Sequence, residues 1–380
     1  MYIKQLTSGK SKCAFLSCNI EKTMNITAQN EIQPSMNATG ENTSTALNST
    51  LSLTDDIWMY PYILRLSTTL LFSLIIFFGL LGNSFVVATL IRWPDMRTAF
   101  NLLIANISLA DLGVCVAAAP LRIIEIFRGW IFGDVMCYIL TPLQDVFVVG
   151  SVISHTVIAF ERHRAIASPF KQKITLKRAK TIVLVIWLAS YLTAGVPMMI
   201  LLKNQPAGDG YYYCFPVFTN DKYRIAYKIY LVVLFIAVPL VLQLARYVDI
   251  IRVLRAKDGI YAKSFKTNTL QWKALKKRLH QKKRLVRMLV VLMVGFQLCY
   301  LPRAMVMLMS EFVPDLISRP WFMYVELITL AMFYLKHVIN PLILCVMSDD
   351  FRAGCFTICC ASEGDESSRQ EVPAVPRAIE

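Results

Sequence analysis

Seven long apolar stretches recur along the chain, separated by shorter polar segments. They cover residues 62–92, 101–124, 136–160, 180–201, 226–252, 285–309 and 321–347. Each is close to the roughly 20 residues that a helix needs to cross a bilayer. Buried helices of a soluble protein would not be so uniformly apolar in so many segments. The pattern therefore predicts an all-α membrane protein, a seven-transmembrane helix bundle.

Composition and charge support this prediction. Hydrophobic residues make up 56% of the 380 residues and charged residues only 17%, which is too apolar for a soluble domain of this size. The formal net charge of +15 lies mostly in three alternate connections, residues 92–97, 161–180 and 252–284. Basic connections are cytoplasmic by the positive-inside rule, so the charge reports topology and not nucleic-acid binding. An odd number of spans then places the N-terminus outside the plasma membrane.

The sequence divides into three expected parts. Residues 1–60 are rich in Ser, Thr and Asn and are expected to form a disordered extracellular tail. Residues 61–348 are the seven-helix transmembrane domain, and residues 349–380 are a short cytoplasmic amphipathic helix and tail. The first part carries four clustered glycosylation sequons, at Asn25, Asn37, Asn42 and Asn48.

The cysteines also sort by compartment. Cys137 begins the third apolar stretch and Cys214 follows the fourth, so both would be outside and can form a disulfide that ties the loop to the helix end. Three cysteines follow the last stretch on the cytoplasmic side, where palmitoylation is expected: Cys355, Cys359 and Cys360.

A lysine lies inside the seventh apolar stretch, in "FYLKHVINPLIL". A charge at the depth of Lys336 is costly and needs a partner. Asp111 lies about halfway along the second stretch, at the same depth although the two helices run in opposite directions. The i,i+4 spacing places Lys336 and Asn340 on the same face of their helix. We therefore predict an internal ion pair between Lys336 and Asp111, in preference to a lysine that snorkels to an interface.

Nearly every apolar stretch carries a motif that resembles the rhodopsin-like (class A) G-protein-coupled receptors, over residues 60–355. In chain order these are "GNSFVV", "NISLADL" with Asp111, "WIFG", Cys137, "ERH" with Arg162, Trp187, Cys214, Pro239 with Tyr247, "FQLCYLP" with Phe296 and "NPLIL" with Asn340. The resemblance implies a receptor that binds an extracellular ligand and activates heterotrimeric G proteins. It implies no enzymatic activity and no cofactor, with arrestin and membrane lipids as further partners. A transporter or channel is the alternative, disfavoured because the chain shows no internal repeat.

The resemblance gives Lys336 a specific place. In the family, the aspartate at the position of Asp111 lines a sodium site with a third-helix serine, here Ser151, and an asparagine four residues before the NP asparagine. Lys336 occupies that last position, so its ammonium is expected to stand where sodium would. An opsin is disfavoured, because the retinal-binding lysine of opsins corresponds to Tyr334 in this chain.

The resemblance also places the parts that couple to a G protein. Arg162 is expected to pair with Glu161 at rest and to be released toward the G protein, beside Tyr247. The family tyrosine that ends the NP motif is replaced by Leu344, so its contact with Tyr247 cannot form. The start of the sixth helix, "QKKRLVR", lacks the acid that often holds Arg162.

The sixth helix departs from the family at a second place. Pro239 and Pro302 interrupt the fifth and sixth helices and allow each to bend. Tyr300, two residues before Pro302 and one turn from Phe296, stands where the family has a tryptophan. The departures predict altered activation chemistry.

Five residues toward the outer ends of the helices are candidate ligand contacts: Arg122, Gln144, Asp145, Arg303 and Glu326. Monoamine receptors carry an aspartate at the position of Gln144, so an amine pocket is disfavoured. Charges of both signs suit a peptide, and the chain looks most like the neuropeptide receptors of the galanin and allatostatin type. The alternatives are a small acidic or lipid-like ligand, or a receptor that signals without one.

Overall fold

The computed structural model describes residues 43–168, 172, 174–206, 211–264, 270–317 and 319–360. Seven helical segments within these ranges are long and apolar enough to cross a membrane: Leu64–Arg92, Ala99–Arg128, Gly133–Ala167, Leu176–Leu201, Asp221–Gly259, Ala274–Phe312 and Trp321–Met347. The predicted seven-helix bundle is therefore confirmed. The sequons at Asn25, Asn37 and Asn42 lie outside the described residues.

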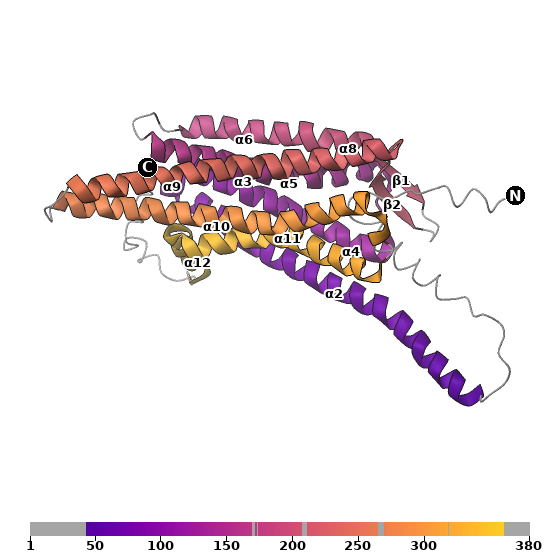
Figure 1. Ribbon diagram of the computed structural model, residues 1–380. Helices are drawn as coiled ribbons and strands as arrows, with labels where there is room; N and C mark the ends of the chain where they lie inside the picture. The colour runs from indigo at the N-terminus through magenta and orange to yellow at the C-terminus, as the bar shows by residue number, and fades with distance from the viewer. Residues whose placement is uncertain are drawn as a thin grey trace.

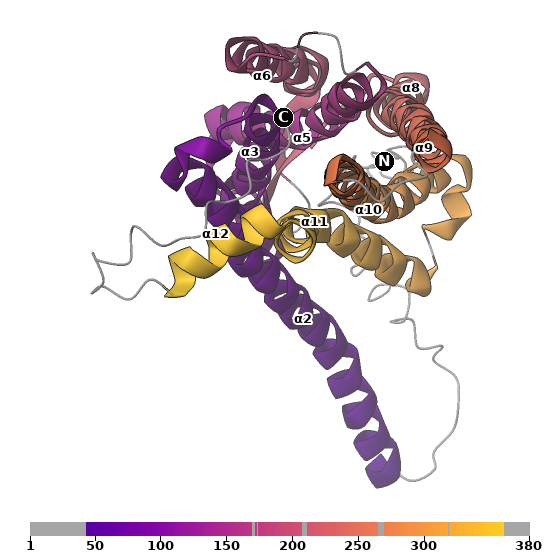
Figure 2. The ribbon, with the colours of Figure 1, turned by 90° about the vertical axis from the view of Figure 1, so that its left-hand side faces the viewer.

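The first helix, α2, runs from Thr43 to Arg92, and its N-terminal part projects away from the bundle (Figures 1 and 2). Residues 43–60, which include the sequon at Asn48, belong to this helix and lie within the segment expected to form the extracellular tail. Pro61 lies inside this helix and removes one backbone hydrogen bond, so residues 43–60 extend the first span beyond a proline.

The second, fourth and fifth spans each contain a π-helical turn between two α-helices. The second consists of α3 (Ala99–Gly113), the turn Val114–Ala118 and α4 (Ala119–Arg128). The fourth consists of α6 (Leu176–Ser190), the turn Tyr191–Gly195 and α7 (Val196–Leu201). The fifth consists of α8 (Asp221–Val232), the turn Val233–Ala237 and α9 (Val238–Ser264).

A proline occupies the second position after each π-helical turn: Pro120, Pro197 and Pro239. A proline ring clashes with the carbonyl group four residues earlier and provides no N–H group. The wider π turn accommodates both effects, so the helix continues across the membrane. Pro302, by contrast, lies inside the continuous helix α10 (Leu270–Phe312).

The remaining spans are single helices. The third is α5 (Gly133–Ala167) and the seventh is α11 (Pro320–Met347), with α10 between the fifth and the seventh. The expected short helix after the last span is α12 (Asp349–Cys360), which turns across the end of the bundle (Figure 2). Gly354 lets α12 approach α2 closely, because a Cβ atom at Gly354 would lie 2.4 Å from Cγ2 of Thr89.

The two ends of the bundle differ. At one end, β1 (Leu202–Pro206) pairs antiparallel with β2 (Tyr212–Pro216) (Figure 1). A disulfide of 2.01 Å joins Cys137 of α5 to Cys214 of β2. The predicted disulfide is confirmed. We call this the hairpin end and the opposite end the α12 end.

Two large apolar clusters hold the spans together, and α5 contributes to both while it contacts α3, α6 and α9. The cluster nearer the α12 end includes Leu103, Ile158, Tyr247 and Leu344. The second cluster includes Phe72, Val152, Phe296 and Tyr300.

Candidate functional site

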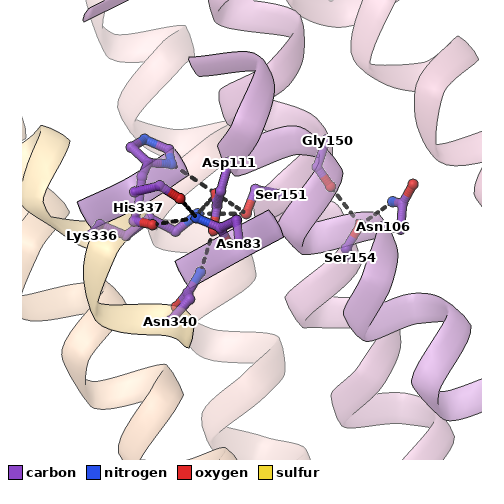
Figure 3. A network of polar contacts seen from close by, with 10 residues as sticks. Asn83, Asn106, Asp111, Gly150, Ser151, Ser154, Lys336, His337 and Asn340 are labelled. Atoms are coloured by element: carbon purple, nitrogen blue, oxygen red, sulfur yellow. Dashed lines mark hydrogen bonds and ion pairs between the residues drawn. The ribbon is translucent and has the colours of Figure 1, made fainter. Parts of the chain in front are cut away.

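A polar cluster is enclosed within this apolar bundle, centred on Asp111 of α3 (Figure 3). Lys336 reaches it from α11, and its Nζ atom lies 2.6 Å from Oδ1 of Asp111. The same ammonium donates to Oγ of Ser151 on α5 over 2.5 Å. The side chains of Asp111 and Lys336 are 0% and 1% exposed, so the pair has no access to solvent. The structure thus brings together all three residues that the sequence placed in one site.

Asp111 has two further partners on α11. Asn340 donates from Nδ2 to Oδ2 over 2.7 Å, and Nδ1 of His337 lies 2.7 Å from Oδ1. A buried carboxylate requires several charge-assisted hydrogen bonds to offset its lost hydration. Three side chains of α11 surround the carboxylate of Asp111: Lys336, His337 and Asn340. The role of His337 was missed by sequence reasoning, although this histidine is as much an intramembrane polar residue as its neighbour Lys336.

The backbone of α11 is fixed at this level by α2. Asn83 donates from Nδ2 to the carbonyl oxygen of His337 over 2.8 Å and to that of Gly79 over 2.9 Å. Asn83 is fully buried. The asparagine of the "GNSFVV" motif therefore fixes the backbone of α11 at His337, one of the three residues of α11 that reach Asp111.

The residues around Asp111 do not fit a sodium ion. The ammonium of Lys336 lies against both Oδ1 of Asp111 and Oγ of Ser151, on the two side chains expected from the resemblance to line a sodium site. A second cation at these oxygens would face a like charge at close range in a medium of low dielectric constant. Among the described residues, no group of three or more His, Cys, Asp or Glu side chains could hold a metal ion.

An aromatic stack connects this cluster to the sixth span. The ring centroid of Phe296 lies 5.7 Å from Nζ of Lys336, and Phe296 stacks on Tyr300 with centroids 4.3 Å apart. Tyr300 also packs against Phe333 of α11 at 4.7 Å. Tyr300 lies two residues before Pro302, so direct contacts link Lys336 to the part of α10 that contains this proline.

Near the α12 end, Arg162 bonds to its neighbour Glu161. Nη2 of Arg162 donates to Oε1 of Glu161 over 2.7 Å, and the guanidinium lies 4.1 Å from the ring centroid of Phe100. Both charged side chains are largely enclosed, with exposures of 13% and 10%. Leu344 packs into the same apolar cluster as Tyr247, in the place where the family has a second tyrosine.

Two basic residues of α10, Lys283 and Arg284, pair with acids on the neighbouring helices α9 and α12. Arg284 of α10 forms a double contact with Asp349 of α12, and Nη2 donates to Oδ1 over 2.7 Å. The hydrogen bond from Arg284 lowers the pKa of Asp349 below its usual value, aided by the nearby charge. Lys283 pairs with Asp258 of α9 at 2.8 Å. Asp258 of α9 and Asp349 of α12 therefore hold the part of α10 that lies near the α12 end of the bundle.

At the hairpin end, three candidate ligand residues lie together. Nη1 of Arg122 donates to Oε2 of Glu125 over 2.5 Å, and Nη2 donates to Oε1 of Gln144 over 3.2 Å. Asp145 interacts electrostatically with Arg122. Arg122, Glu125 and Gln144 are all buried, and Glu125 was not anticipated from the sequence.

The other two candidates lie on α10 and α11, where Arg303 interacts electrostatically with Glu326 and with Arg122. A further ionic group joins α8 to α10, since Arg224 and Lys228 donate to Glu311 over 2.9 and 2.6 Å. This group was missed because "DKYRIAYKIY" reads as an exposed, polar helix start, whereas all three side chains are buried.

Comparison with known proteins agrees with the geometry. The family model of the 7 transmembrane receptor (rhodopsin family) matches residues 82–344. The chain belongs to this family. The resemblance to the rhodopsin-like G-protein-coupled receptors is thereby confirmed, and the receptor is not an enzyme.

Several known receptors are similar to this one. The Pyroglutamylated RF-amide peptide receptor of Rattus norvegicus is 28% identical over 310 residues, which cover 78% of this chain and 70% of the relative. The Substance-K receptor of Mus musculus is 28% identical over 309 residues, covering 78% and 76%. The Neuropeptide Y receptor type 1 of Xenopus laevis is 29% identical over 265 residues, covering 67% and 70%.

Proposed function

We propose that this receptor is activated by a peptide outside the plasma membrane and transmits the signal to a heterotrimeric G protein. Membership in the rhodopsin family and the peptide ligands named for its relatives support the proposal. The observation that carries it is the ionic and polar group of Arg122, Glu125 and Gln144 at the hairpin end.

A peptide matches this group chemically because it offers charged side chains and backbone amides together. Arg122, Gln144, Asp145, Arg303 and Glu326 are the proposed contacts. The four charged residues among them contribute two positive and two negative charges, so a ligand with groups of both signs can exchange partners with each of them. A small acidic ligand would form ion pairs with Arg122 and Arg303 but no favourable contact with Asp145 and Glu326. A lipid-like ligand would form ion pairs with none of these four residues.

The hairpin end is proposed to face outward, in agreement with the basic connections at the α12 end. This topology places the N-terminal sequons where glycosylation occurs and Cys355, Cys359 and Cys360 where palmitoylation occurs. Arrestin and membrane lipids are further proposed partners of the α12 end. Removal of N-linked glycans should lower the apparent mass of receptor labelled at the cell surface, and an unchanged mass would contradict an outward N-terminus.

We further propose that Lys336 acts as a tethered cation in place of sodium. Its contacts with Asp111 and Ser151 support this role, because one ammonium satisfies both oxygen atoms. If the ion pair separates on activation, the movement of Lys336 would be transmitted through Phe296 to Tyr300. Phe296 lies against the Lys336 ammonium and stacks on Tyr300.

The activity is tested by a peptide-library screen on cells that express the receptor, with several second messengers recorded in parallel. Each active peptide is then tested on cells that express Arg162→Ala at an equal surface level. Peptides that signal through the unchanged receptor and not through this variant support the proposal. A failure of all peptides, with signalling by small acidic or lipid-like compounds, would replace the ligand class and leave the coupling part intact.

A further inference from the structure

Two cysteines meet where the seventh span passes into α12. The Sγ atom of Cys345, in the last turn of α11, lies 3.2 Å from the Sγ atom of Cys355 in α12. Both side chains are half-buried. A single bond between two sulfur atoms is about 2.05 Å long, so an approach of little more than 1 Å would join them.

The same contact activates one of the two thiols. The hydrogen bond with Cys345 lowers the pKa of Cys355 to about 7, against the opposing effect of partial burial. About half of such a thiol is thiolate at neutral pH, whereas an ordinary cysteine of pKa ~8.5 is only about 3% ionised. The thiolate is the nucleophile in thiol–disulfide exchange, so Cys355 is the attacking residue and Cys345 the second.

We propose that Cys345 and Cys355 are a redox-sensitive pair that forms a reversible disulfide between α11 and α12. The oxidant is a low-molecular-weight disulfide such as glutathione disulfide. The thiolate of Cys355 attacks one sulfur atom of the oxidant, breaking its S–S bond, forming a mixed disulfide and releasing one glutathione thiolate. Cys345 then loses its proton to solvent and attacks the sulfur of Cys355, which releases the second glutathione. Two protein thiols are oxidised and one glutathione disulfide is reduced to two thiols.

The bond would change what the α12 end can do. It would fix α12 to the end of α11, and with it Asp349, which holds Arg284 of α10. It would also exclude palmitoylation of Cys355, because a thioester and a disulfide need the same sulfur atom. Intracellular disulfides outside hyperthermophiles are usually transient and redox-sensing, which fits the proposed cytoplasmic position of this pair. That position rests on the proposed topology, whereas the chemistry can be tested on purified receptor alone.

The experiment treats purified receptor in detergent with glutathione disulfide at pH 7, traps the remaining thiols by alkylation and identifies cysteine-containing peptides by mass spectrometry. Unchanged receptor should yield a peptide linked through Cys345 and Cys355, and reduced glutathione should reverse the link. Cys345→Ser should instead accumulate glutathione on Cys355, because the second thiol is missing. Cys359→Ser, in the same helix, should form the link as the unchanged receptor does.

The rate provides a second readout. Modification of Cys355 should rise only about twofold between pH 7 and pH 9, against roughly 25-fold for an ordinary thiol of pKa ~8.5, because much of Cys355 is already thiolate at pH 7. The proposal is overturned if unchanged receptor accumulates glutathione on Cys355 without forming the link, or if the rate at Cys355 rises as steeply with pH as that of an ordinary thiol. Neither outcome would affect the proposed ligand or G-protein coupling.

Discussion

Lys336 of α11 crosses the bundle to Asp111 of α3, so that a lysine ammonium and a carboxylate lie 2.6 Å apart with almost no exposure to solvent. A buried pair of this kind pays a large desolvation cost, and replacement by apolar residues is often neutral or stabilising. This cost fits the proposal that the pair acts in switching. The contacts of Asp111 with α11 and of Lys336 with α5 must all change if α11 shifts relative to α3 and α5.

If Lys336 acts as a tethered cation in place of sodium, sodium should have little effect on the ligand affinity or the thermal stability of the unchanged receptor. Lys336→Asn should lower the free energy of unfolding by about 3–5 kcal/mol in potassium salts, because it strands the charge of Asp111. Sodium should restore part of this loss, since the oxygen atoms of Asp111 and Ser151 then become available to an ion. Thermal unfolding in detergent, with sodium exchanged for potassium, measures both effects.

A double-mutant cycle separates this pair from a general effect of losing a lysine. Asp111→Asn combined with Lys336→Asn should recover much of the stability that either change loses alone. Lys283→Asn is the matched control, because its partner Asp258 is 56% exposed and such a surface pair contributes only about 0.2–1 kcal/mol. Strictly additive losses in the buried cycle would show that the two charges do not depend on each other.

Arg162 makes a separate prediction about coupling. Arg162→Ala should abolish G-protein activation while ligand binding and surface expression persist. The change removes a charge near the end of α5 and no member of the buried apolar clusters, although it loses the contact with Phe100. Nucleotide exchange on purified G protein measures the effect. Arg252→Ala is the control, since this arginine is 75% exposed near the same end of the bundle and pairs only loosely with Asp249 at 3.5 Å. Equal exchange by the Arg162 variant and the unchanged receptor would show that this receptor does not use the family switch.

The contact between Arg284 and Asp349 predicts a restraint on the sixth span. If α10 moves away from α12 during activation, Arg284→Ala should raise ligand-independent nucleotide exchange. The pair is partly exposed, so the expected contribution is about 0.2–1 kcal/mol, or roughly a 1.5- to 5-fold change in the resting equilibrium. Arg352→Ala removes another partner of Asp349 but lies on α12 itself, so it should leave exchange unchanged. A decrease in exchange for Arg284→Ala would mean that the contact supports the active state.

The pH dependence of this restraint follows from the lowered pKa of Asp349. A carboxyl group whose pKa falls on pairing contributes its stabilisation above the pKa it has without Arg284, and loses it as the pH falls through the lowered value. Both values lie well below neutrality. Ligand-independent exchange should therefore not change through Asp349 between about pH 6 and 8.

The sequence predicts the spans well because the bilayer imposes their length and their apolar character directly. It predicts their ends poorly, since apolarity marks only the hydrocarbon core. The helix α10 begins at Leu270, before the apolar stretch that starts at residue 285, because "LQWKALKKRLHQKK" contains strong helix formers and neither Gly nor Pro.

The same distinction applies to the candidate sites. Lys336 and Asp111 could be paired from sequence, because two intramembrane charges of opposite sign at one depth leave few alternatives. Arg284 and Asp349 could not, because their contact depends on the direction in which α12 leaves α11 at Ser348. Apolar periodicity does not encode that direction, and the two residues are 65 positions apart.

The pair of Arg122 and Glu125 tests the ligand site without removing a charge. Arg122→Ala alone is ambiguous, because it would strand the buried Glu125 and could simply unfold α4. The exchange Arg122→Glu with Glu125→Arg keeps an i,i+3 ion pair on the same helix face but moves each charge by three positions and removes the contact from Arg122 to Gln144. Surface expression and thermal stability should remain near those of the unchanged receptor, whereas activation by the peptide found in the screen should fall at least tenfold in potency. The corresponding exchange of Asp249 and Arg252, another i,i+3 pair at the opposite end of the bundle, should leave peptide potency unchanged. If the exchange at Arg122 and Glu125 keeps full potency, this group serves only to hold α4 in place, and the ligand contacts must be sought among Arg303, Glu326 and the residues around Glu311.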